Sequence, residues 1–235
     1  MQGFPADFAL LVGYFLGCAL LALLMRRFLT LPGEVYRKML HFILVASIFV
    51  FLYGFDSWYE ACLAATIFAV AAYPALSFAE RFESYAALLA ERKGGEIKRS
   101  LIAAFTMFAA IIAICWGLFG ARYLALAVIL GWGLGDAAAA LVGKKYGRHH
   151  LKGKFIDGQK SLEGTAAMLV VSFLAIGAVL LLNGDLPRQY LPAIASVAAL
   201  VCAVVELHTK NGMDTLTCPA STLAVLLLLL RIWGG

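Results

Sequence analysis

An acidic residue lies within a long apolar stretch of this sequence. Asp136 belongs to residues 131–143, which read GWGLGDAAAALVG. On a helix, Asp136 shares a face with two alanines and Gly143, and Gly131 with Gly135 forms a small-xxx-small pair that lets another backbone approach closely. A carboxylate in such a crevice can bind a divalent cation together with phosphate oxygens. The alternative is a carboxylate that only hydrogen-bonds to a neighbouring helix for packing.

A basic turn and a helix start follow Asp136. The run KKYGRHH begins at Lys144, and the run GQKSLEGT contains Lys160, Ser161 and Glu163. Ser161 can cap the helix that follows, leaving free N–H groups that make an anion site beside Lys160. We therefore assign Lys144, Lys160 and Ser161 to nucleotide or phosphate binding. Glu163 is a candidate catalytic residue, although an acid in a first helical turn also simply complements the helix dipole.

Two further carboxylates come towards the C-terminus. Glu206 ends an apolar segment, and Asp214 precedes Pro219. Because we expect a helix to begin at Pro219, Asp214 either caps that helix or contributes to chemistry. Glu206 lies in the last apolar turn and has no such simple structural explanation. We predict Asp136, Glu206 and Asp214 as metal ligands, and Asp136, Glu163 and Glu206 as catalytic residues.

A third basic group lies near the N-terminus, where Arg37, Lys38 and His41 occur together. Arg37 and His41 share one face of a helix because they are four residues apart. An arginine is suited to bidentate recognition of phosphate, so we assign these three residues to nucleotide binding as well. The alternative is a basic collar at the membrane interface.

The composition indicates that most of the chain lies in a lipid bilayer. It is 63% hydrophobic and only 14% charged, whereas soluble domains are about half apolar and about a quarter charged. Its apolar blocks reach the roughly 20 residues that cross a bilayer as a helix. We expect an all-α, polytopic bundle of eight transmembrane helices, or seven if one segment is re-entrant, in a single integral membrane domain over residues 1–235. The expected helices cover residues 7–25, 41–55 (continuing a helix that starts near Glu34), 58–78, 101–119, 123–143, 162–182, 190–207 and 219–233.

The basic residues predict the orientation in the membrane. All but three of the 19 Lys and Arg residues fall in odd-numbered loops, and the positive-inside rule places those loops in the cytoplasm. No basic residue precedes the first apolar segment, so we expect a retained helix and not a cleaved signal. We therefore predict a protein of the cytoplasmic membrane whose active site faces the cytoplasm. The loops predicted to form that site are 26–41, 144–163 and 206–219.

Carboxylates and basic side chains gathered at one membrane face suit a magnesium–nucleotide site. Mg²⁺ keeps few protein ligands and shares the phosphate oxygens of its substrate. The sequence contains no GxxxxGK[ST] loop and no protein-kinase signature set, so phosphate binding would have to be of another type.

The motifs together resemble those of a family of membrane enzymes. Residues 135–143, the basic turn, and KSLEG at 160–164 resemble the core shared by the phosphatidate cytidylyltransferases and the dolichol/phytol/diacylglycerol kinases. The runs RKMLHF at 37–42 and DTLTCP at 214–219 resemble the kinase branch. Two departures stand out: Thr215 replaces the Asn common in the kinase branch, and the Lys-Asp, Pro-Gly-His-Gly-Gly and Asp-Arg pattern of the cytidylyltransferases is absent.

The resemblance implies a kinase that transfers the γ-phosphoryl group of CTP to a membrane lipid alcohol, with Mg²⁺ as cofactor. The acceptor would be a polyprenol, a phytol- or farnesol-like alcohol, or diacylglycerol. The expected partners are CTP, this lipid and the bilayer, with no nucleic acid. One alternative is a phosphatidate cytidylyltransferase that makes CDP-lipid. Another is a non-enzymatic lipid-binding or transport protein, although transporters tend to place binding groups near the midplane between repeats.

Overall fold

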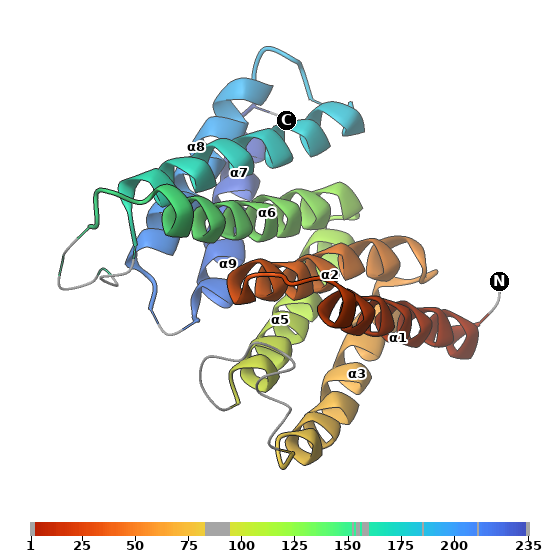
Figure 1. The fold of residues 1–235 in the computed structure, drawn as a ribbon. Coiled ribbons are helices and arrows are strands. Elements are labelled where there is room, and N and C mark those ends of the chain that lie inside the picture. Colours follow the sequence, from red (N-terminus) through yellow and green to blue (C-terminus); the bar gives the residue numbers. More distant parts are fainter. Residues whose placement is uncertain are drawn as a thin grey trace. The chain divides into compact units, whose positions relative to one another are not determined.

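The computed structural model describes residues 3–82, 95–151, 153, 156, 160–184, 186–210 and 212–233. Within these ranges the chain is all-α, and eight helices are long and apolar enough to span a membrane, which confirms the predicted polytopic class. Uniformly apolar blocks favour helices because only intrahelical hydrogen bonds satisfy the backbone in lipid. The elements are α1 (Phe4–Phe28), α2 (Gly33–Tyr53), α3 (Trp58–Ala79), α5 (Glu96–Ile112), the π-helical segment η1 (Ala113–Leu118), α6 (Arg122–Tyr146), α7 (Leu162–Asn183), α8 (Leu191–His208) and α9 (Asp214–Trp233) (Figure 1).

Helix α5 begins earlier than the sequence pattern predicted, whereas α2 begins as expected. The predicted start of α5 at residue 101 is wrong because the helix begins at Glu96. Its first turn is polar, but Lys98 is anchored to α3 by Glu80 at 2.7 Å and by Ser77 at 3.0 Å. Tertiary ion pairs thus stabilise a turn whose composition resembles a loop. For α2, the start at Gly33 confirms the expected continuation from near Glu34.

The last helix begins at Asp214 and not at Pro219, so the predicted proline start is wrong. Pro219 lies inside α9, where its missing N–H leaves the carbonyl of residue 215 without its usual helical donor. Membrane helices tolerate such a proline when neighbouring groups satisfy the freed backbone. As a result Asp214 belongs to the first turn of α9, where a carboxylate complements the positive end of the helix dipole.

The chain forms two compact units, Met1–Gly117 and Leu118–Gly235. The prediction of one integral membrane domain over residues 1–235 stays a prediction. In the first unit, aromatic rings pack the core between α2 and α5, where the Phe51 ring meets Phe105 and Phe108 edge-on at 5.9 and 6.1 Å between centroids. The Tyr14 hydroxyl of α1 donates to the Ile43 carbonyl of α2 at 2.6 Å.

The second unit contains a close crossing of α6 and α7. A Cβ atom on Gly131 would lie 2.7 Å from Ile176 Cγ1, and one on Gly135 would collide with the Ser172 hydroxyl oxygen. That hydroxyl donates to the Gly131 carbonyl at 2.8 Å. The expected role of the small-xxx-small pair is therefore confirmed, and the crossing fixes the part of α6 that carries Asp136.

Candidate active site

In the second unit, the described contacts of Lys160 join the start of α7 to the end of α8. Lys160, which directly precedes α7, reaches the C-terminal end of α8. Its ammonium donates to the Thr209 carbonyl at 3.0 Å and to the Glu206 carbonyl, and it pairs with Glu206 Oε1 at 2.9 Å. A cation at the end of a helix satisfies carbonyls that have no intrahelical donor. Lys160 therefore holds the start of α7 against the end of α8.

Glu206 is a buried carboxylate on which the charges of other acidic side chains act. It is 9% exposed, and the charges of Asp136 and Asp214 act on it together with that of Lys160. Asp136 comes from α6, Glu206 from α8 and Asp214 from α9. Within the described residues, no three His, Cys, Asp or Glu side chains are grouped so that they alone could hold a metal ion. The prediction that Asp136, Glu206 and Asp214 are metal ligands stays a prediction.

The α7 N-terminus has the predicted serine cap. Ser161 is 3% exposed, and its hydroxyl accepts from the Gly164 N–H at 3.1 Å. The Leu162 N–H, however, donates to the His149 carbonyl at 2.9 Å. One of the N–H groups that we expected the cap to leave free therefore has a partner within the chain. The predicted phosphate contact of Ser161 stays a prediction.

Close packing of α6 on α7 continues down to this cap. A Cβ on Gly164 would lie 2.8 Å from the Ala139 carbonyl and 3.3 Å from Gly143 Cα. A Cβ on Gly147 would lie 2.8 Å from the Ser161 hydroxyl oxygen. Glycines thus let the chain leave α6 directly over the start of α7.

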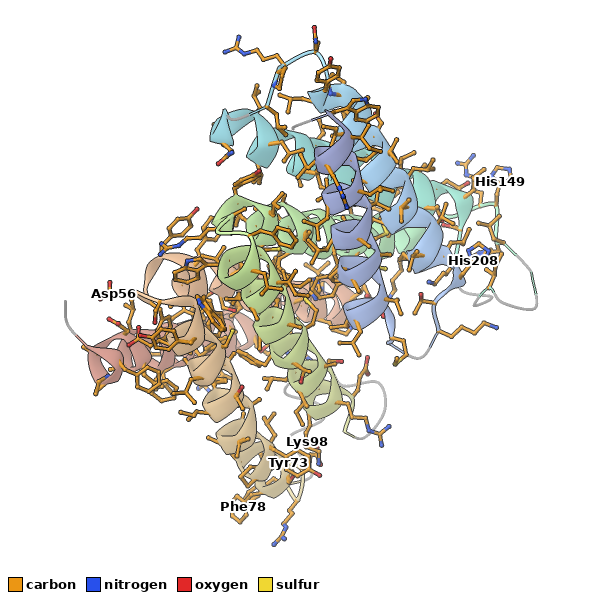
Figure 2. The ribbon with its side chains drawn as sticks, turned by 180° about the vertical axis from the view of Figure 1, so that it is seen from behind. Asp56, Tyr73, Phe78, Lys98, His149 and His208 are labelled. Carbon is orange, nitrogen blue, oxygen red and sulfur yellow. The ribbon has the colours of Figure 1, made fainter. Side chains whose placement is uncertain are left out.

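Glu163 faces the turn after α6. Its carboxylate contacts His149 Nδ1 at 2.7 Å and accepts from the His149 N–H at 3.3 Å. Figure 2 shows His149 at the same end of the second unit as His208, which follows Glu206 in α8. Because its carboxylate accepts from His149 and from the Arg148 backbone as well as from its own N–H, Glu163 serves there as a clamp between α7 and this turn. Its predicted catalytic role stays a prediction.

The remaining predicted residues are distributed over both units. Lys144 is exposed in the last turn of α6. Arg37, Lys38 and His41 lie on α2 in the first unit. Arg37 pairs with Glu34 at 2.5 Å and with Glu96 at 3.5 Å, and Lys38 is 5% exposed. In these contacts Arg37 links α2 to α5, and the nucleotide role of the α2 group stays a prediction.

Sequence reasoning missed two residues that organise the second unit. Ser172 is fully buried in α7, and its bond to Gly131 holds α6 in place beside Asp136. Thr209 supplies a carbonyl to Lys160, and its hydroxyl lies 3.0 Å from that of Thr217 in α9. A polar residue within an apolar block is a signal that could have identified Ser172, whereas Thr209 has no comparable signal.

Two curated proteins share part of their sequence with this chain. A phytol kinase of Synechocystis is 31% identical over 108 residues, which cover 46% of this chain and 42% of the relative. A dolichol kinase of Saccharomyces cerevisiae is 48% identical over 46 residues, which cover 20% of this chain and 8% of the relative. The chain thus spans less than half the length of each. No family model and no solved structure matches it.

These partial similarities support a lipid kinase family, and together with the eight apolar helices they support an integral, multi-pass membrane protein. Chemically, the second unit offers the Glu206 carboxylate and the Lys160 ammonium in an ion pair near the end of α8, with Asp214 at the start of α9 and Asp136 within α6 acting on Glu206. That arrangement can bind a divalent cation and accept a proton from a hydroxyl.

Proposed function

We propose that the chain is a CTP- and Mg²⁺-dependent kinase that phosphorylates a membrane lipid alcohol. In this reaction the lipid hydroxyl oxygen attacks the γ-phosphorus of CTP, the bond to the β-phosphate oxygen breaks, and CDP leaves. The hydroxyl proton passes to a carboxylate of the protein. Phosphoryl transfer asks a protein mainly for positioning and charge neutralisation, which a small polar cluster at a membrane interface can supply.

The observation that carries the proposal is the group around Glu206. A glutamate that is 9% exposed in an apolar helix has Lys160 at 2.9 Å and the charges of Asp136 and Asp214 nearby. Ionisable groups in membrane segments are costly and mark functional sites. The partial similarity to a phytol kinase and a dolichol kinase adds independent support for a lipid kinase.

The donor set of this group fits magnesium. Mg²⁺ prefers carboxylate oxygens, uses one or two of them, and takes its other ligands from water and substrate phosphates. Within the described residues, no group of three His, Cys, Asp or Glu side chains is placed to hold a metal by itself, so CTP oxygens would complete the shell. Bound Mg²⁺ would neutralise charge that develops on the transferred phosphoryl group.

Each residue of the group has a proposed role. Asp136 would hold Mg²⁺, with Glu206 or Asp214 as second ligand. Lys160 would position Glu206 and offset its charge, since its three donors are used within the chain. Between the two candidate proton acceptors, Glu206 is favoured over Glu163, because Glu163 is engaged by His149.

The deciding experiment is transfer of label from γ-labelled CTP to lipids by the purified protein with Mg²⁺. The panel contains phytol, farnesol, a long polyprenol and diacylglycerol, and ATP replaces CTP in a parallel series. Labelled lipid phosphate from one alcohol supports the kinase and identifies its acceptor. If pyrophosphate is released only with phosphatidate, the protein is a cytidylyltransferase. If neither product forms and CTP with Mg²⁺ does not change the melting temperature, the enzymatic proposal is wrong.

A further inference from the structure

A second feature of interest is a groove within the first unit, between α3 and α5. It has a volume of about 500 Å³ and is lined by one face of each helix. From α3 come Ala65, Thr66, Ala69, Val70 and Tyr73, and from α5 come Ile102, Phe105, Thr106 and Ala109. Small side chains predominate, so the two helices do not fill the space between them. The walls are mainly apolar, as in sites that hold hydrocarbon.

Both ends of the groove are closed by contacts between the same two helices. At one end, the Cys62 thiol of α3 donates to the Ala109 carbonyl of α5 at 3.3 Å. At the other end, Lys98 of α5 donates to the Ser77 hydroxyl of α3 at 3.0 Å. One end is therefore apolar and the other is polar.

The length of the groove matches one leaflet of a bilayer. From Ala65 to Tyr73 the α3 axis rises about 12 Å, whereas a single leaflet contributes about half of a hydrocarbon core of roughly 30 Å. The polar end lies where α3 ends and α5 begins, which is a membrane interface for both helices. Because its α3 lining residues, 65–73, start within α3 and extend past the middle of that helix, the groove lies at depths where hydrocarbon chains are the available occupants.

The polar end carries an excess of positive charge. Lys98 lies 5.1 Å from the centre of the Tyr73 ring and is paired with Glu80 at 2.7 Å. Figure 2 shows Tyr73, Phe78 and Lys98 together at this end of the two helices. Around them, the described residues 80–82 and 95–99 include three cations and two carboxylates, and one of the carboxylates already pairs with Arg37. These residues are Arg81, Lys98, Arg99, Glu80 and Glu96. Such a basic end attracts anionic head groups.

We propose that the α3–α5 groove binds one acyl chain of an anionic phospholipid, whose phosphate lies at the Lys98 end. The apolar walls, the length of one leaflet and the charge at the interface all match this amphiphile. The site lies wholly within the first unit and does not depend on the proposed kinase activity. It is a lipid site separate from the carboxylate group of the second unit.

The test uses the full chain in phosphatidylcholine nanodiscs that contain a small fraction of photoactivatable phosphatidylglycerol with a diazirine in one acyl chain. A phosphatidylcholine probe with the same chain measures the head-group preference. Cross-linked peptides are then quantified by mass spectrometry. We expect the phosphatidylglycerol probe to label residues 65–73 and 102–109 more strongly than the phosphatidylcholine probe does.

Two substitutions test acyl-chain binding and head-group preference separately. Ala69→Leu fills the groove and should reduce labelling on the order of tenfold, as expected when added methylenes block an apolar pocket. Ala71→Leu makes the same change on an exposed part of α3 outside the groove and should leave labelling unchanged. Lys98→Gln should keep labelling by the phosphatidylcholine probe and abolish the preference for phosphatidylglycerol. If Ala69→Leu does not fold, Ala109→Leu fills the groove from α5 instead.

Several results would overturn the proposal. Equal labelling by both probes in the wild type would show that the site does not prefer an anionic lipid. Equal effects of Ala69→Leu and Ala71→Leu would show that the acyl chain does not bind in the groove. Displacement of the probe by added phytol but not by added phosphatidylglycerol would make the groove a site for a lipid alcohol. Cross-links between two copies of the chain at these residues would make it an interface.

Discussion

The polar ends of the two units differ in how their carboxylates are surrounded. In the first unit, Glu34 and Glu96 both pair with Arg37, and Glu80 pairs with Lys98. In the second unit, Glu206 has one ammonium at 2.9 Å and the charges of two other carboxylates as neighbours. The first arrangement alternates opposite charges, whereas in the second the charges of two carboxylates act on a third that is buried.

This difference separates structural pairing from a candidate site. Alternating charges tie α2 and α3 to α5 and need no further partner to be favourable. Like charges near Glu206 repel one another and oppose folding, so their presence is understandable where a cation binds. The comparison predicts that charge changes in the second unit affect activity, whereas those in the first unit affect stability.

The largest expected effect comes from Asp136→Asn. Removing the proposed Mg²⁺ ligand should lower the rate of γ-phosphoryl transfer by a factor on the order of 10² to 10³, with little change in melting temperature because the side chain keeps its size. The measurement is the initial rate with labelled CTP as Mg²⁺ is titrated. Asp56→Asn, between α2 and α3 of the first unit, is the matched control. Full activity and unchanged Mg²⁺ dependence in Asp136→Asn would show that Asp136 is not a Mg²⁺ ligand.

The packing of the two units can be compared through Gly135→Ala. The new Cβ would collide with the Ser172 hydroxyl oxygen and lie 3.2 Å from Met168 Cγ, so we expect a loss of about 1–3 kcal/mol in the free energy of unfolding. Gly17→Ala in α1 is the control, because nothing lies within 4 Å of a Cβ there. It should be neutral or slightly stabilising. Equal denaturation midpoints for the two variants in detergent would contradict the close crossing.

Much of the fold follows from the sequence because lipid imposes helices on apolar blocks. The earlier start of α5 could not be predicted, because Lys98 needs α3 to provide Glu80 and Ser77. The start of α9 could not be predicted either. Local rules place Pro219 at the start of a helix, whereas the structure places it inside α9. In both cases a tertiary environment decides where a polar turn or a proline is tolerated.

The candidate site was predictable in its residues but not in its contacts. Asp136, Glu206 and Asp214 are conspicuous because carboxylates are rare next to apolar blocks, and the charges of the other two act on Glu206. Lys160 was expected to face a phosphate, whereas the structure directs it to Glu206 and Thr209. Residue type indicates what a side chain can bind, but only the fold determines which partner is within reach.

The roles of Lys160 in the second unit and Lys98 in the first can be compared by replacing each with glutamine, beginning with Lys160→Gln. We expect it to lower the transfer rate by about tenfold, equivalent to about 1.4 kcal/mol, because Glu206 loses the cation that positions it. Lys160→Arg keeps the charge and should recover part of the rate. Lys98→Gln in the first unit should lower the melting temperature and leave the KM for CTP unchanged. The measurement is the transfer rate and the KM for CTP of all three variants. A loss of rate in Lys98→Gln as large as that in Lys160→Gln would contradict the separation of roles between the two lysines.

The smallest expected effect concerns the clamp between His149 and Glu163. The imidazole side chain is 74% exposed, and water screens exposed ion pairs so that they contribute little to stability. His149→Ala should therefore change both stability and the transfer rate only slightly, as should the neighbouring control His150→Ala. A large loss of rate in His149→Ala with unchanged stability would mean that the clamp positions Glu163 for chemistry. In that case Glu163, and not Glu206, becomes the better candidate for the proton acceptor.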